Sequence, residues 1–152
     1  MKTRQGFVSN SSSSSFVIIS NFGNLISPKL PSQLVVDGSH GETEFGWKFE
    51  NYYDFWSKLN WAYMQASYMS SPKKETWTDM IEEVIKRNTD VETIDWRITT
   101  SYPPEEGKVD GYIDHQSCCY EGENTEIFDS INKLTNFLFN PNSHIEDGND
   151  NC

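Results

Sequence analysis

The fold of this chain is decided by residues 52–66, which read YYDFWSKLNWAYMQA. Their apolar side chains recur at intervals of three and four residues, at Tyr52, Phe55, Trp56, Leu59, Ala62, Tyr63 and Ala66. That spacing places them on one stripe of a helix of about four turns. The run SSP at 70–72 predicts the end of this helix and the start of another.

Two further helical patterns follow. The first ends at Lys86 and Arg87, whose positive charges suit a helix C-terminus. The second covers 125–139 and is broken by Pro141. From the in-facing positions of the helices and of a strand near Trp96, we expect a core that contains Trp56, Leu59, Trp77, Ile81, Trp96, Ile98, Phe128, Ile131 and Leu134.

Short apolar or alternating runs predict strands at 16–20, 33–37, 45–49, 91–100 and 108–114, the last two as a hairpin. The element order is then β-β-β-α-α-β-β-α. This order predicts a single α+β domain over 1–152, with a largely antiparallel sheet and the helices on one face. Residues 1–15 are expected to be a Ser-rich N-terminal arm in loop conformation, and 141–152 an acidic tail with at most one short edge strand.

The net charge is −11 and is unevenly distributed. Residues 104–152 hold 11 acidic and 2 basic side chains. Such a chain is repelled by nucleic acid and by anionic membranes, so neither is an expected direct partner. The excess of acid serves solubility or forms an acidic face for a basic protein partner.

Three cysteines, an odd number, do not make a disulfide framework. No apolar run approaches the ~18 residues of a membrane helix, and the N-terminus lacks the apolar region of a signal peptide. We therefore expect a cytoplasmic protein, in a host cytosol, with reduced thiols. No cofactor is expected.

Two further site hypotheses rest on polar clusters. Ser11, Ser12, Ser13 and Ser14 precede a strand, and consecutive backbone N–H groups and hydroxyls there could cradle an anion; a flexible loop or a modification target is the alternative. His115, Cys118 and His144 are the residue types that bind zinc; a hydrogen-bonded histidine and buried thiols are the alternative. No catalytic triad or nucleotide-binding motif is present in the sequence, which argues against an enzyme without excluding one.

Surplus aromatic residues suggest a surface for a partner protein. Tyr53 and Trp61 lie off the apolar stripe of the first helix, where anchors for a partner are expected; packing against the sheet is the alternative. Glu121, Glu123 and Glu126 lie in the acidic C-terminal third and would steer a basic partner.

The opening RQGFVSNSSSSSFVI, residues 4–18, resembles the start of a group of uncharacterised small proteins from phages and bacteria with a GFVSNSSSSSF-type run. The likeness extends more loosely to GYIDHQS at 111–117 and to 139–151. It implies phage or mobile-element ancestry. The resulting hypothesis is a phage or mobile-element accessory protein that binds a host protein and inhibits a host enzyme or defence factor. Alternatives are a minor virion or assembly component and a small nucleotide- or metal-binding enzyme.

Overall fold

The computed structural model describes residues 13–46, 48–113 and 125–149. Within them the helices and strands are, in chain order, β1 (Ser13–Ile18), β2 (Gln33–Val36), β3 (Glu44–Phe45), β4 (Glu50–Tyr52), α1 (Phe55–Ser67), α2 (Lys73–Asn88), β5 (Thr93–Trp96), β6 (Ile98–Thr99), β7 (Val109–Asp110), β8 (Tyr112–Ile113), the 3₁₀ turn η1 (Glu126–Phe128), α3 (Ile131–Phe139) and β9 (His144–Asn149). The predicted α+β class is confirmed, but the described strands form several small sheets, three of them parallel pairs, and not the one largely antiparallel sheet that was predicted.

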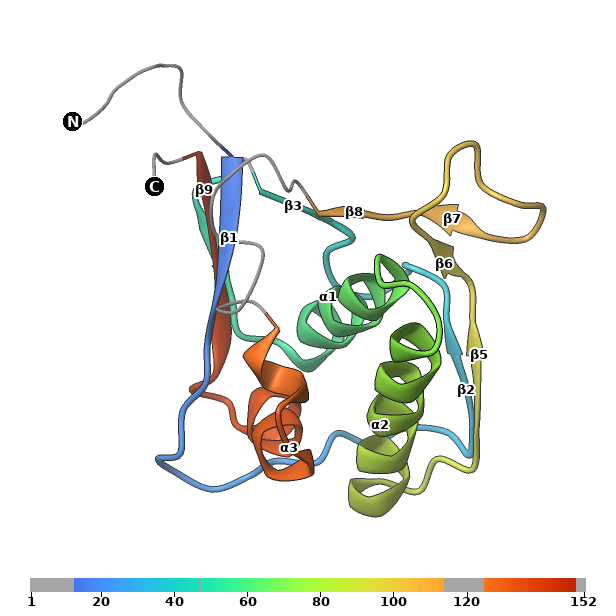
Figure 1. Ribbon diagram of the computed structural model, residues 1–152. Coiled ribbons are helices and arrows are strands. Elements are labelled where there is room, and N and C mark those ends of the chain that lie inside the picture. The colour runs from blue at the N-terminus through green and yellow to red at the C-terminus, as the bar shows by residue number, and fades with distance from the viewer. Residues whose placement is uncertain (1–12, 47, 114–124, 150–152) are drawn as a thin grey trace.

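Helix α1 lies at the centre of the molecule. In Figure 1 the helices stand between the sheet of β1, β9 and β4 on the left and the pair β2–β5 on the right. α1 packs on α2, α3, β6 and β8, and its buried residues come from all round its circumference. A helix that is covered on all sides buries apolar groups beyond a single stripe. This is why Trp61, off the predicted stripe, is fully buried.

The three-stranded sheet has the order β1-β9-β4, and both of its pairings are antiparallel. β9 is therefore its central strand, and the prediction that 141–152 form an acidic tail with at most an edge strand was wrong. The predicted loop over residues 1–15 was also wrong at its end, because β1 begins at Ser13. Pairing with β9 satisfies the backbone groups of this serine run, which overrides the local preference of serine for turns.

Three short pairs are parallel: β2 with β5, β3 with β8, and β6 with β7. The predicted hairpin between 91–100 and 108–114 was therefore wrong, since Ile98 pairs with Val109 in the parallel sense. Helix α1 approaches the chain closely at Gly111, between β7 and β8. A larger residue at this position would clash, because an added Cβ would meet Met64 Sδ of α1. The segment predicted as one strand at 45–49 is also divided, and Phe49 is 79% exposed.

The helix predictions differ from the structure at the starts of the first and third helices. Tyr52, the first residue of the predicted stripe, lies in β4, and α1 begins at Phe55 after its cap Asp54. α2 begins directly after Pro72 and ends at Asn88, as its sequence pattern indicates. The third helix is interrupted because the Ser130 side chain accepts a hydrogen bond from Lys133 N and so starts α3 afresh. Of the nine predicted core residues, five are buried and four, Trp56, Trp77, Trp96 and Ile131, are partly buried against the core.

Candidate binding pocket

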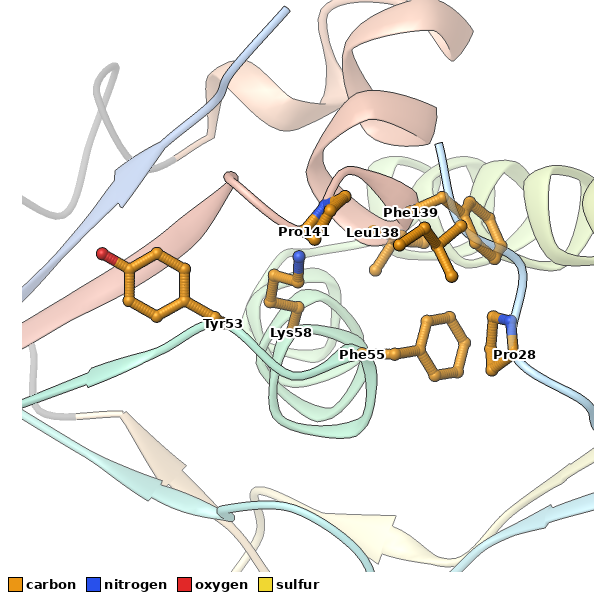
Figure 2. A pocket seen from close by; sticks show the side chains of 8 residues that line it. Pro28, Tyr53, Phe55, Lys58, Leu138, Phe139 and Pro141 are labelled. Carbon is orange, nitrogen blue, oxygen red and sulfur yellow. The ribbon is translucent and has the colours of Figure 1, made fainter. Parts of the chain in front are cut away.

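A pocket of about 140 Å³ opens between the start of α1, the end of α3 and the loop 21–32. Its walls are mainly apolar, and Figure 2 shows its side chains from all three segments. The lining residues are Ile26, Pro28, Tyr53, Phe55, Lys58, Leu138, Phe139 and Pro141. Phe55 and Phe139 stack on one another at 5.4 Å between ring centroids, which ties α1 to α3 at the pocket wall.

The loop that forms one wall is held in place by the turn between α3 and β9. Asn140 Nδ2 donates to Ser20 O and to Phe22 O, both at 2.9 Å. Ile26 N donates to Phe139 O at 2.8 Å, and Ser20 N donates to Ser143 Oγ. These bonds fix a segment without regular secondary structure onto the core, so the pocket is already formed without a ligand.

Lys58 is the charged group of the pocket. Its side chain is 1% exposed, and its ammonium donates to Asn140 O and Ser143 O, each at 2.9 Å. Burial lowers the pKa of Lys58 to about 8, although the nearby Asp54 carboxylate acts in the opposite direction. Asp54 itself caps α1 by accepting a hydrogen bond from Ser57 N. Within the described part of the chain, no ion pair involves Lys58.

Tyr53 forms the outer wall beside the β9 sheet. Its ring stacks on His144 at 4.3 Å between centroids, and it remains 48% exposed. His144 is further fixed by contacts from its ring nitrogens to Asn142 O at 3.2 Å and to Glu146 Oε2 at 3.1 Å. Tyr53 therefore presents a rigidly supported aromatic face at the surface.

Exposed apolar residues continue from the pocket along the loop. Ile26, at the pocket itself, is 60% exposed, and Leu25 and Phe22 are exposed earlier in the same loop. Single exposed apolar residues are common, but a group of them beside an apolar pocket marks an interaction surface. We call Phe22, Leu25, Ile26 and Tyr53 the apolar rim of the pocket.

A second, polar hollow shares Pro28 with the pocket. It is lined by Lys29 and Arg87, together with Asp90 and neutral residues of 27–28 and 88–89. Arg87 also pairs with Glu83 on α2. The hollow next to the pocket thus holds both basic and acidic groups.

Asp147 is a second buried ionisable group, away from the pocket. It is 5% exposed; its Oδ1 accepts a hydrogen bond from Gly46 N, and its Oδ2 has no partner among the described residues. Burial raises the pKa of Asp147 to about 6, against the lowering effect of the backbone N–H groups of Gly46 and Lys48. Asp147 does not line the pocket at Lys58, the hollow at Lys29 or the hollow at Arg97.

The predicted partner-binding residues lie in different environments in the structure. Tyr53 lies at the surface on the rim of the pocket. Trp61 is 0% exposed, so its assignment to a partner surface was wrong; its indole Nε1 donates to Ser15 Oγ inside the core. Glu126 is at the surface, 3.9 Å from Lys133 Nζ. Glu121 and Glu123 lie outside the described residues.

The anion-site and zinc-site hypotheses fall in large part outside the described residues. Ser11 and Ser12 lie outside the described residues, and Ser13 and Ser14 form the start of β1. His115 and Cys118 also lie outside them, while His144 is occupied by Tyr53, Asn142 and Glu146. Over residues 13–46, 48–113 and 125–149, no group of three His, Cys, Asp or Glu side chains could hold a metal ion.

Sequence reasoning missed Lys58 as a site residue, although a signal was present. Residues 61 and 64 made α1 apolar beyond its stripe, and a helix that is apolar all round is buried. Lys58 lies in the first turn of this helix and is buried with it. Its partners, the carbonyls of residues 140 and 143, could not be foreseen because they depend on how α3 docks.

Comparisons with protein-family models, with curated proteins and with solved structures found no match for this chain. No helix in the part of the chain that the structure describes is long and apolar enough to cross a membrane. A functional assignment must therefore rest on the geometry of the pocket and its surroundings.

Proposed function

We propose that this protein acts by binding another protein, which inserts an apolar group into the pocket between α1, α3 and the loop 21–32. The observation that carries the proposal is the apolar rim: exposed Ile26 and Tyr53 line a preformed apolar pocket, and exposed Phe22 and Leu25 precede Ile26 in the same loop. Interfaces concentrate their binding energy in such pockets, where an apolar or aromatic anchor is removed from water.

The loop geometry supports binding over catalysis. The backbone of the loop is bonded to the turn after α3, so its apolar side chains are presented in fixed positions at little further entropic cost. The lining offers one charged group, Lys58, and no acid–base pair within hydrogen-bond reach of it among the described residues. A chemical step needs more than one positioned group.

We further propose a biological setting for this binding, which is an accessory role in a phage or mobile element, in the cytosol of a host whose protein is the partner. Inhibition of a host enzyme or defence factor is the role that suits a small binding protein. The likeness of residues 4–18 to phage and bacterial proteins supports the setting, and the −11 net charge supports a partner that is not nucleic acid.

Affinity capture from host lysates with matched variants tests the binding surface. Ile26→Asp places a charge at the pocket mouth, where the side chain is exposed, so the fold is unchanged while an apolar anchor is excluded. Tyr102→Asp is the control, because Tyr102 is 83% exposed in the loop between β6 and β7. A protein retained by the wild type and by Tyr102→Asp, but lost with Ile26→Asp, is the expected result. Equal retention by both variants would remove the pocket from the interface.

A further inference from the structure

We propose that the group received by the pocket is the C-terminal residue of the partner polypeptide, with an apolar side chain packed against Phe55 and Phe139 and its carboxylate on the ammonium of Lys58. This inference rests on the proposed protein-binding function and names the chemistry of the partner.

The size of the pocket sets the size of the group. A closed apolar cavity of about 150 Å³ holds one benzene ring. The pocket, at about 140 Å³, therefore has room for one large side chain such as leucine or phenylalanine and not for two. Its apolar walls, Pro28, Leu138 and Pro141 among them, suit an aliphatic or aromatic side chain.

The charge of the pocket selects an anion. An ammonium group carries three N–H donors, and two of those on Lys58 are used by Asn140 O and Ser143 O. The third has no acceptor among the described residues and can therefore serve a ligand; Figure 2 shows the amine beside Pro141, between Tyr53 and the apolar wall. Buried cations are normally compensated by an anion, yet Lys58 has none within ion-pair distance in the described residues.

A chain terminus satisfies both requirements within one residue. An internal Asp or Glu would bring its carboxylate but no apolar side chain, and two residues exceed the volume. At a C-terminus the carboxylate and the side chain share one Cα, so a single residue can reach Lys58 and fill the apolar walls. Capture of a C-terminal carboxylate by a preformed set of donors is a recurrent mode of peptide recognition.

The surroundings suit the approach of such a chain end. Lys29 lines the hollow next to Pro28 and, unlike Arg87, has no ion pair among the described residues, so it offers positive charge beside the pocket. The remainder of the peptide would pass over the apolar rim, where Ile26 and Tyr53 are exposed. A negatively charged, apolar C-terminus is therefore attracted locally by a protein that is acidic as a whole.

Paired peptides test the inference on the unmodified protein. The probes are an N-acetylated hexapeptide that ends in phenylalanine with a free carboxylate, and the same peptide as its C-terminal amide. We expect the acid to bind about tenfold more tightly than the amide at pH 7 by calorimetry, since a charged hydrogen bond is lost. The preference should decrease above pH 8, where Lys58 loses its proton. Equal affinity of the acid and the amide would overturn the inference.

A variant and a small acid complete the test. Lys58→Met should abolish the preference for the acid, whereas Lys133→Met, at an exposed lysine of α3, should retain it. 3-Phenylpropionate should bind more weakly than the peptide acid; tighter binding would indicate a small-molecule site and contradict a polypeptide occupant. If neither peptide binds while Ile26→Asp still abolishes partner capture, the C-terminal inference fails and the protein-binding function stands. If neither peptide binds and Ile26→Asp leaves partner capture unchanged, the proposed protein-binding function of the pocket fails as well.

Discussion

The two ends of β9 each place a charged group out of water, but they do so in different surroundings. Directly before β9, Ser143 O accepts a hydrogen bond from the Lys58 ammonium, beside a pocket that is open to solvent. We call this the pocket end. Near its last residues, Asp147 is enclosed by β1, β4 and Gly46 with one oxygen unpaired; we call this the enclosed end.

The difference shows how to distinguish a buried charged side chain that can bind a ligand from one that only lowers the stability of the fold. A buried ion beside a pocket can gain a counter-ion from a ligand, and its charge then contributes to recognition. A buried ion with no access can only change its protonation state, and its charge then appears as pH-dependent stability. A perturbed pKa therefore does not by itself locate a functional site, and the opening beside the group decides.

The largest expected loss of stability comes from a substitution that tests whether the enclosed end is part of the packed core. Trp61→Ala should reduce the free energy of unfolding by about 3–5 kcal/mol, because a fully buried tryptophan is replaced by a cavity. It also removes the indole donor to Ser15, the neighbour of Asp147 in the sheet. Urea unfolding measures the loss. Trp77→Ala, at a partly buried position, should cost less, and a loss below about 1 kcal/mol for Trp61→Ala would contradict its burial.

Asp147→Asn tests the charge at the enclosed end. The folded-state pKa near 6 is above the ordinary 3.8, so the folded protein binds the extra proton between these values. The contribution of the Asp147 carboxyl to the free energy of unfolding is therefore fully present below pH 4 and is lost as the pH rises through 6. The variant should be more stable than the wild type by about 2 kcal/mol at pH 8 and equal to it near pH 4.

Neighbouring charges define the control for that experiment. Glu42, Glu50, Lys48 and the Tyr52 hydroxyl all act on or lie near Asp147, and none of them is altered by the substitution. Asp79→Asn, at an exposed position of α2, provides the matched change without burial. A pH profile of Asp147→Asn that parallels the wild type between pH 4 and 7 would show that the carboxyl is not the source.

The pocket end should show the opposite pH sign. The folded-state pKa of Lys58, about 8, is below the ordinary 10.5, so the unfolded chain binds the extra proton between these values. Wild-type stability should therefore rise by about 1 kcal/mol between pH 8 and 9.5. Lys58→Met should remove this rise, as followed by urea unfolding at several pH values. A rise that persists in Lys58→Met would assign it to another group.

The smallest expected effect separates recognition from stability at the rim. Tyr53→Ala removes the stacking on His144 and should cost about 0.5–1 kcal/mol of stability, because the ring is half-exposed. Its effect on capture of the partner should exceed this cost. Tyr102→Ala, which is equally aromatic and more exposed, should change neither quantity. Comparable losses in stability and in binding would make Tyr53 a structural residue only.

Local signals in the sequence predicted the helices well and the strand pairing poorly. The start of α2 after Pro72 and its end at Asn88 depend on residues within the helix, so periodicity and charge indicated them. The central position of β9 depends on residues 13–18 and 50–52, far away in the chain, and no local pattern encodes that pairing. Acidic residues within 144–149 suggested a solvated tail, yet Asp147 is buried by the sheet.

The candidate site was predictable to the same limited extent. Surplus aromatic content selected both Tyr53, which is exposed, and Trp61, which is buried in the core. The two differ because Tyr53 precedes α1 while Trp61 faces the core from within it. The pocket itself joins segments near 26, 58 and 139, whose proximity follows from tertiary packing.

The central position of β9 has a consequence for how the chain is made. β1 and β4 do not pair with one another; each pairs with β9. The ribosome must therefore deliver residues 144–149 before either early strand gains its partner, while α1 and α2 are adjacent and can already pack. Contacts between distant segments form slowly, and unpaired strands are prone to association with other chains. We expect the nascent protein to be most vulnerable to aggregation in the interval between synthesis of β4 and synthesis of β9.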